Sequence, residues 1–181
     1  MHKLTVTISA RLYDPHGRLI RKFRPRAAHS FLAQFIEFLQ VQMGQIQTSI
    51  TKTDNTEVDA NVSTQNLRVN AGSSTLTWGM LIGSGTNPVD IDDYKLQTQI
   101  TTDLTVSIHT FVLSYPTASS RRLVISRTFT NAMDSPMAIE EVALYSLLDP
   151  SHFICLDRTL YSVSIPAASS LDLIYRIDVS V

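Results

Sequence analysis

The two ends of the chain alternate between apolar and polar residues. Apolar side chains occupy every second position from Leu4 to Leu12, and again from Leu171 to Val181. Successive side chains of a β-strand point to opposite faces, so a period of two is typical of a strand with one buried face. Both ends of the chain therefore predict half-buried strands, and they favour a β structure over a helical bundle.

Turn-forming residues divide the chain into about eight such strands. Residues 14–17 (Asp-Pro-His-Gly) form a predicted turn, and the chain returns over 18–24 to complete a β-hairpin. The other expected strands are 76–82, 104–114, 123–130, 138–147, 153–163 and 171–181. Short strands at this spacing predict a mainly β fold, a two-sheet β-sandwich of jelly-roll type.

Length and composition are consistent with one domain over residues 1–181. Only 17% of the residues are charged, and Cys155 is the single cysteine, so no internal disulfide can form. The N-terminus lacks a signal peptide pattern, and no apolar run is long enough to span a membrane. We expect a soluble protein from a reducing compartment, with no role at a membrane.

One segment has helical rather than strand periodicity. Phenylalanine and leucine recur at three- and four-residue spacing over about residues 30–43, where Ser30 can cap the start and Gly44 can end the helix. This apolar stripe either closes an open side of a β core or packs on a neighbouring subunit. The stripe consists of Phe31, Leu32, Phe35, Phe38 and Leu39.

Residues 45–74 are polar and nearly free of aromatic side chains. A segment of this length is too long for an ordinary connection between two elements. We therefore expect a long polar arm or loop within the same domain.

Basic residues are concentrated at the start of the chain. The first 26 residues hold seven of the 15 Lys and Arg residues and one acid, which gives +6 against −7 for the remainder. Such a dipolar chain can dock its basic end on an acidic neighbour, including another copy, although a solvated strand face explains the pattern equally well. Because the overall charge is −1, no nucleic acid is expected. The candidate docking residues are Arg18, Arg21, Lys22, Arg24 and Arg26, with the basic pair Arg121 and Arg122.

No motif of known chemistry is complete. The Gly83–Gly85 loop lacks the lysine of a phosphate-binding loop, and the sequence has no nucleophile elbow. Asp90, Asp92 and Asp93 offer oxygen ligands to calcium, or else Asp92 or Asp93 caps a short helical turn, and we favour the cap. The histidines, His2, His16, His29, His109 and His152, show no metal-binding spacing.

Two further residue types have structural interpretations. Cys155 lies between apolar neighbours and is expected to pack as a small apolar side chain. Glu140 and Glu141 are adjacent on a strand and should face opposite ways, so they do not form a catalytic pair. We therefore expect no enzyme activity, no cofactor and no metal.

Several patterns, taken in order along the chain, resemble small structural proteins of tailed bacteriophage virions. The similarity covers most of the chain except 45–74. Ala143 stands where a glycine is usual, and residues 168–170 are Ala-Ser-Ser where Ala-Gly is usual. The first pattern is residues 81–88 (Leu-Ile-Gly-Ser-Gly-Thr-Asn-Pro), followed by 92–96 and Ile100. The second is residues 127–131 (Arg-Thr-Phe-Thr-Asn) followed by 139–145 (Ile-Glu-Glu-Val-Ala-Leu-Tyr). The others are residues 156–159 followed by the last strand, and the first hairpin followed by residues 30–32.

The resemblance implies a non-enzymatic building block of a tail, neck or capsid-surface assembly. Such a protein would be made in the bacterial host cytoplasm, form a homo-oligomer and dock to other virion proteins. The alternative is a carbohydrate- or receptor-binding β-sandwich module, whose candidate aromatics are Trp78, Tyr94, Tyr115 and Tyr161, with Trp78 favoured as a core residue. A cupin-like metalloenzyme ranks third because the histidines are scattered.

Overall fold

The computed structural model describes residues 3–27, 34, 37, 38, 41, 47–60 and 67–180, and this part of the chain is mainly β. The strands found there pair antiparallel throughout. They are β1 (Lys3–Tyr13), β2 (Leu19–Ala27), β3 (Thr48–Thr51), β4 (Glu57–Ala60), β5 (Gly79–Gly83), β6 (Leu104–Val106), β7 (Thr110–Ser114), β8 (Ser120–Asn131), β9 (Met137–Asp149), β10 (His152–Ile165) and β11 (Ser170–Ser180).

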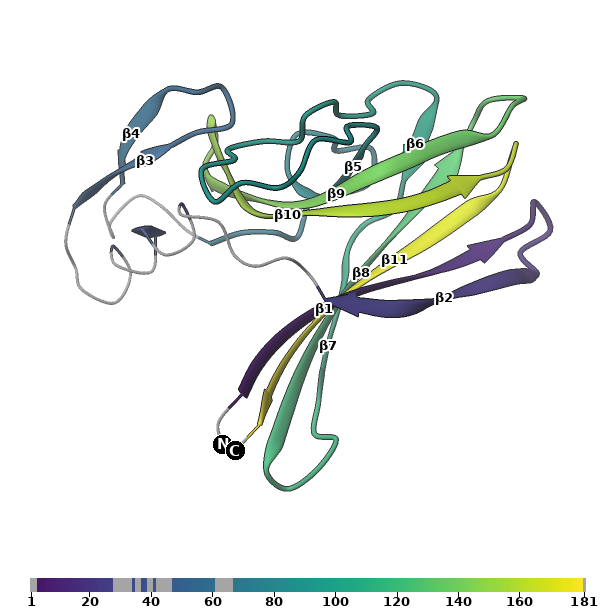
Figure 1. Ribbon diagram of the computed structural model, residues 1–181, viewed down its shortest axis with the longest axis horizontal. Coiled ribbons are helices and arrows are strands. Elements are labelled where there is room, and N and C mark those ends of the chain that lie inside the picture. Colours follow the sequence, from purple (N-terminus) through teal and green to yellow (C-terminus); the bar gives the residue numbers. More distant parts are fainter. Residues whose placement is uncertain are drawn as a thin grey trace.

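The strands form a large sheet, a small sheet and a hairpin (Figure 1). The large sheet has six strands in the order β2-β1-β11-β8-β6, with β7 also paired to β8. The small sheet has the order β10-β9-β5, and the hairpin joins β3 to β4. The β7 end of the large sheet projects away from the small sheet, beside the two chain termini (Figure 1).

The terminal strands and the first hairpin are confirmed. β1 pairs along its whole length with β11, from Lys3 opposite Ser180 to Tyr13 opposite Ser170. At the predicted turn, Asp14 Oδ1 accepts hydrogen bonds from the amides of His16 (2.9 Å) and Arg18 (2.8 Å). These bonds fix the reversal that the Asp-Pro-His-Gly sequence predicts.

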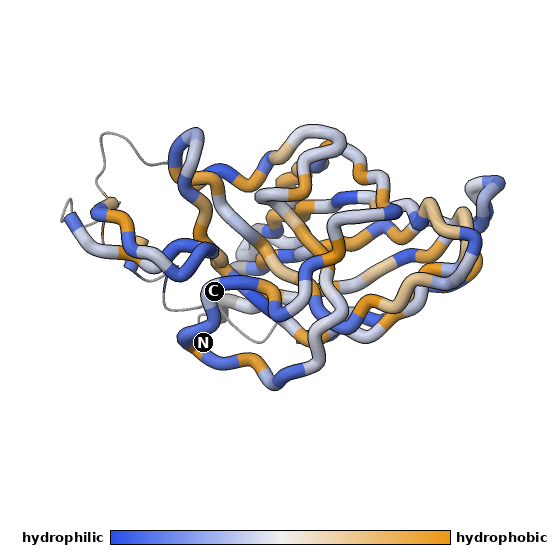
Figure 2. Tube along the Cα trace, turned by 90° about the horizontal axis from the view of Figure 1, so that it is seen from above, coloured by the Kyte–Doolittle hydropathy of each residue, from blue (hydrophilic) through white to orange (hydrophobic). Residues whose placement is uncertain are grey.

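One hydrophobic core lies between the large and small sheets. Buried side chains from β1, β8 and β11 meet buried side chains from β5, β9 and β10 in a single cluster. Figure 2 shows apolar and polar positions following one another along the strands of the molecule. Each large apolar side chain buried here contributes roughly 1.5–3 kcal/mol.

The expected strand 104–114 is interrupted, which corrects the prediction. β6 and β7 pair with the same edge of β8, with Val106 opposite Phe129 and Thr110 opposite Ser126. Between these two pairs, three residues (107–109) therefore face two residues of β8 (127 and 128), as in a β-bulge. The bulge turns His109 inward, where 8% of its surface is exposed.

Only four residues of the expected helix 30–43 are described, and all four are helical. Among them, Phe38 and Val41 are fully buried in the main core. The remaining residues of that prediction lie outside the described part of the chain. Where the helix is described, its apolar side chains therefore cover the β core.

The polar segment 45–74 contains secondary structure that the sequence did not indicate. Residues 48–51 and 57–60 pair as β3 and β4, and Ile50 and Ala60 are fully buried in the main core. Further on, Arg68 forms a β-bridge with Leu147 of β9. Two side chains of this segment thus contribute to the main core, although most of its described residues are exposed. Among the described residues, no helix is long and apolar enough to cross a membrane.

Candidate functional site

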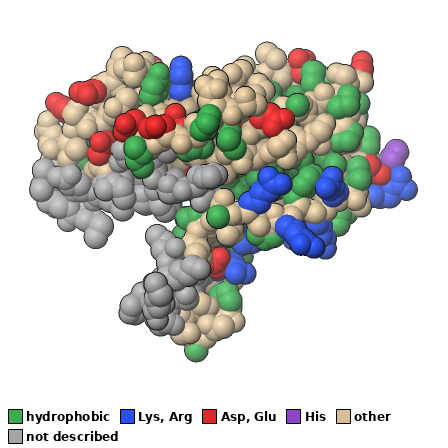
Figure 3. Space-filling model, in the orientation of Figure 1, with side chains coloured by type: hydrophobic (Ala, Val, Ile, Leu, Met, Phe, Trp, Pro, Cys, Tyr) green, Lys and Arg blue, Asp and Glu red, His purple; other side chains and the backbone are tan. Residues whose placement is uncertain are grey.

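Five of the seven predicted docking residues gather along one edge of the large sheet. β2 is the outermost strand, and all its residues except Phe23 are exposed. We call this edge the basic strip: Arg18, Arg21, Lys22, Arg24 and Arg26. Figure 3 shows Lys and Arg side chains gathered over β2 and the adjoining turn.

The cations of the basic strip differ in how they are held. Arg18 donates to Asp14 Oδ2 at 2.8 Å, and this bonding lowers the pKa of the Asp14 carboxyl. The guanidinium of Arg21 lies 4.9 Å from the ring centre of Phe23, and that of Arg26 lies 5.5 Å from the ring centre of Tyr161. Within the described residues, no carboxylate lies at ion-pair distance from Arg21, Lys22, Arg24 or Arg26.

The other predicted pair is not part of the strip. Arg121 and Arg122 lie on β8, with β1 and β11 between them and β2. Arg122 Nε donates to Asp178 Oδ1 at 2.6 Å, so its charge is already paired. The side chain of Arg121 lies outside the described residues.

Acidic side chains gather elsewhere on the molecule. In Figure 3 most of them lie over the β3–β4 hairpin and the loop that follows β5, away from the basic strip. Burial raises the pKa of Glu37, and the charges of Asp92 and Glu57 raise it further, so these three carboxyls lie close enough to repel one another. We call this region the acidic face, and its defining residues are Glu37, Glu57 and Asp92.

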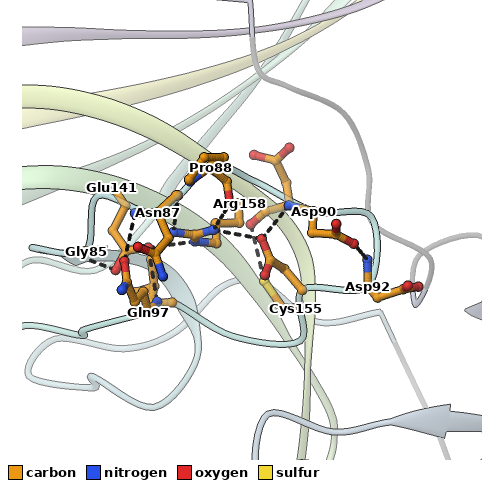
Figure 4. A network of polar contacts seen from close by, with 12 residues as sticks. Gly85, Asn87, Pro88, Asp90, Asp92, Gln97, Glu141, Cys155 and Arg158 are labelled. Carbon is orange, nitrogen blue, oxygen red and sulfur yellow. Dashed lines mark hydrogen bonds and ion pairs between the residues drawn. The ribbon is translucent and has the colours of Figure 1, made fainter.

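A buried ion pair fastens the loop of residues 84–99 to the small sheet (Figure 4). Glu141 of β9 is fully buried, and Arg158 of β10 is 1% exposed. Arg158 Nε donates to Glu141 Oε2 at 2.6 Å, and Arg158 Nη1 donates to Asp93 Oδ2 at 2.7 Å. Arg158 Nη2 also donates to the carbonyl of Asn87 at 3.0 Å.

The second half of this network uses backbone donors. Glu141 Oε1 accepts from the amides of Gly85 (3.1 Å) and Thr98 (2.8 Å), and Oε2 accepts from Gln97 (3.1 Å). Several hydrogen-bond donors and an arginine partner greatly reduce the cost of burying a carboxylate. These contacts hold the loop in place and leave no acceptor of Glu141 turned to solvent.

A second buried arginine joins the two sheets. Arg127 of β8 is 1% exposed and donates only to backbone carbonyls, those of Met80 (2.8 Å), Ser107, Gly72 and Thr75. Burial lowers its pKa to about 10, so it remains charged at pH 7. Arg127 therefore ties the large sheet to β5 and to the segment before it.

His109 completes this junction. Its Nε2 accepts from the amide of Met80 at 2.8 Å, and its Nδ1 lies 3.0 Å from the carbonyl of Ala71. These partners require the neutral tautomer with the proton on Nδ1. Burial lowers the pKa of His109 to about 4, and the nearby Arg127 charge contributes to the shift.

The sequence analysis did not single out these buried ionic groups. A signal was present for Arg127, which shares the apolar positions of β8 with Leu123, Ile125 and Phe129. A lone charge on the apolar face of a strand implies buried partners. The amides that donate to Glu141 come from a loop 43 to 56 residues away, and no sequence pattern marks them.

The turn contacts and burial of the remaining predicted candidates indicate roles in the fold. Asp90 and Asp93 close a turn rather than cap a helix, since the Asp93 amide donates to the Asp90 carbonyl at 3.2 Å and no helix is described there. As predicted, His16 is exposed, Cys155 is fully buried, and Glu141 is buried while Glu140 is more exposed. His2 and His29 lie outside the described residues. The described residues include no group of three His, Cys, Asp or Glu side chains that could hold a metal ion.

Two shallow grooves lie beside the loop. The larger, about 410 Å³, is lined by half-buried Phe153 and by polar side chains that include Gln97, Gln99 and Thr77. The smaller, about 220 Å³, includes Tyr94 and Asp93. Of the other aromatic candidates, Tyr161 is buried, and Trp78 is partly buried against a small apolar cluster on the small sheet.

Comparisons of this chain with protein families, with characterised proteins and with solved structures found no match.

Proposed function

We propose that this protein is a non-enzymatic structural protein of a tailed bacteriophage virion, in a tail, neck or capsid-surface assembly. It acts by self-association and by docking to other virion proteins. The observation that carries the proposal is the separation of charge into two surfaces, the basic strip and the acidic face.

Two complementary surfaces at different places on one chain favour head-to-tail contacts. The strip of one copy meets the acidic face of the next, and repetition of that contact gives a ring if it closes or a filament if it does not. Because Lys22 and Arg24 are exposed and no described carboxylate pairs with them, their charges remain available to a neighbour. Such charge complementarity also sets the register of docking.

The residues that carry the resemblance to virion proteins have fold-building roles here. Asp93, Glu141 and Arg158 belong to these patterns and fasten the loop, while Arg127 joins the two sheets. Asn131 also belongs to one of these patterns, and its side-chain amide donates to the carbonyls of Ile165 and Ser135. The residues that resemble virion proteins are thus residues that hold this β domain together. This supports a common architecture for this chain and those proteins.

The proposal includes a jelly-roll-like sandwich. Its support is the single core shared by the large and small sheets and the antiparallel pairing of the described strands.

The basic strip can be tested by charge reversal. The variant Lys22→Glu/Arg24→Glu should abolish an association that the parent shows at low salt, measured as absolute mass by light scattering after size exclusion. At about 1 M salt, where the Debye length is about 3 Å, the parent should lose this charge-dependent association as well. For the single variant Lys22→Glu, which should weaken the association, the matched control is Lys95→Glu, which makes the same change in net charge outside the strip and should still associate. A strip variant with the mass of the parent would contradict the proposal, and so would a parent of 20.2 kDa at every concentration.

A second candidate is a carbohydrate- or receptor-binding module, favoured by the groove of about 410 Å³. Phe153 lies there beside amide and hydroxyl side chains, the combination that stacks on and hydrogen-bonds to a sugar. A glycan array tests it, with Phe153→Ala as the variant expected to lose binding and Tyr115→Ala, outside the groove, as the control. An array without hits for folded protein would exclude this candidate.

A further inference from the structure

The two outer edges of the large sheet differ sharply in chemistry. β7 borders the sheet beyond β8, and it consists of Thr-Phe-Val-Leu-Ser with no charged residue and no proline. Its apolar side chains are exposed: Phe111 by 43%, Val112 by 54% and Leu113 by 58%. The β2 edge, by contrast, carries the basic strip and Pro25. Lys, Arg and Pro residues are the usual protection of an edge strand against pairing, and β7 has none.

Phe111 lies where the buried apolar side chains of the large sheet give way to exposed ones. One row across the sheet runs from Ile8 through Tyr175 and Ile125 to Phe111. The first three side chains are 1–2% exposed, and only Phe111 is open. The neighbouring row ends in the same way at Leu113, which is opposite half-buried Leu123. The apolar face of the sheet thus continues to the β7 edge.

The order of residues in β7 is self-complementary. From either end the strand presents a hydroxyl residue, a large apolar residue and then Val112 at its centre. Two antiparallel copies centred on Val112 would place Phe111 opposite Leu113 and Thr110 opposite Ser114, at both ends alike. Cross-strand apolar pairs and Thr–Ser pairs both stabilise antiparallel strands.

We propose that β7 pairs antiparallel with β7 of a second copy of this chain, with Val112 opposite Val112 of that copy across a two-fold axis. The inference rests on the self-association in the proposed function and deepens it by naming a second contact surface. The contact joins two large sheets into one continuous sheet. It is isologous, so it adds a two-fold axis to whatever the head-to-tail contacts build.

A groove beside β7 provides space for the second copy. It has a volume of about 300 Å³ and is lined by Phe111 and by residues 67–70, among them Leu67, which is 44% exposed. Residues opposite each other in an antiparallel pair share a face, so Leu113 of the second copy lies on the same side as Phe111. Its side chain then faces this apolar groove, and the two-fold axis repeats the contact on the other side.

Charge does not oppose this pairing. The nearest described cation on β8 is Arg122, opposite Ser114 and already paired with Asp178. In the proposed register the two Arg122 residues are about 20 Å apart, from four residues along the strand and three strand spacings. This distance exceeds the Debye length of about 8–10 Å at physiological salt.

A cysteine at the two-fold axis tests the register directly. Opposite residues of an antiparallel pair have the Cα separation that a disulfide needs. Val112→Cys should therefore form a covalent dimer under mild oxidation, and the native Cys155 does not interfere because it is fully buried. The control is Ile20→Cys on β2, a position with the same 54% exposure, which should remain monomeric on a denaturing gel. Equal cross-linking at both positions, or none at Val112→Cys, would overturn the inference.

A charge pair gives a second and independent test. Val112→Lys and Val112→Glu each place like charges at the axis and should reduce dimerisation at least tenfold, while an equimolar mixture should restore it as a heterodimer. Circular dichroism and thermal unfolding confirm that each variant is folded. If the mixture stays unpaired, the β7 contact is wrong. The head-to-tail proposal fails in a different experiment, namely if the Lys22→Glu/Arg24→Glu variant associates as the parent does.

Discussion

At the scale of single residues, the two buried arginines are accommodated in different ways. Burial tends to lower the pKa of Arg158, but hydrogen bonds to Glu141 and Asp93 outweigh it and raise the pKa. Arg127 has no carboxylate partner among the described residues and depends on four carbonyls. Arg158 holds a loop on the small sheet, and Arg127 holds the two sheets together. Both side chains therefore have positional roles that aliphatic residues could not fill.

Removing one partner of the Glu141–Arg158 pair should strongly destabilise the protein. Glu141→Gln removes the charge that balances Arg158 in a site closed to water, and breaking a buried pair in this way costs about 3–5 kcal/mol. Urea unfolding measures the loss. Glu140→Gln, on the neighbouring and more exposed position, should change the free energy of unfolding by less than about 0.5 kcal/mol. Equal stabilities of the two variants would show that the pair does not hold the loop.

His109 should make stability depend on pH. The folded protein keeps this ring neutral down to about pH 4, whereas the unfolded chain binds a proton near pH 6.5. Stability should therefore fall as the pH decreases from 6.5 to 4, by roughly 3 kcal/mol in the limit. His109→Gln, which can still donate and accept, should flatten this part of the curve in urea unfolding. A variant with the same slope as the parent would contradict the assignment.

The burial of one of these charged groups could be predicted from the sequence, and that of the other could not. Alternation along β8 places Arg127 among apolar positions, and this conflict was visible in the sequence. The Glu141 site was not visible, because Gly85, Gln97 and Thr98 reach it only through the path of a long loop. A lone buried charge can be inferred from periodicity, but its partners depend on tertiary structure.

At the scale of elements, the periodic strands were predictable and the irregular ones were not. β1, β2, β8, β9, β10 and β11 follow the expected segments within a few residues, because alternation and turn residues agree there. The break between β6 and β7 depends on the contacts of His109 with Met80 and Ala71, which are remote in sequence. β3 and β4 are short and mostly polar, so their sequences do not show a recognisable alternation of apolar residues.

The loop of residues 84–99 requires a small residue where it crosses Glu141. A Cβ added to Gly85 would lie 2.5 Å from Glu141 Oε1 and also collide with Gln97. Gly85→Ala should therefore destabilise the protein by roughly 1–3 kcal/mol and increase amide exchange over the loop. Gly72→Ala is the control, since its nearest contact would be Thr75 Oγ1 at 3.8 Å. Equal protection of the loop in both variants would contradict the proposed role of Gly85.

At the scale of the whole molecule, the sequence showed that basic residues are concentrated near the start of the chain. It did not show where basic and acidic side chains lie on the folded surface. The basic residues of the first 26 positions share an edge because β2 is the outermost strand. The acidic face combines the helical segment, the β3–β4 hairpin and the loop, which are far apart in sequence. The β7 edge is a third distinct surface of the described chain, and these three surfaces are the basis of our proposal that it assembles with copies of itself.

The composition of purified virions tests the central proposal most directly. Particles released from cells that carry the coding sequence are banded in a density gradient, and their proteins are quantified by mass spectrometry. The account predicts this chain in the particle band, in a fixed ratio to the major capsid protein, with Lys22→Glu/Arg24→Glu reducing its incorporation. Complete, infectious particles that lack the chain would contradict the account.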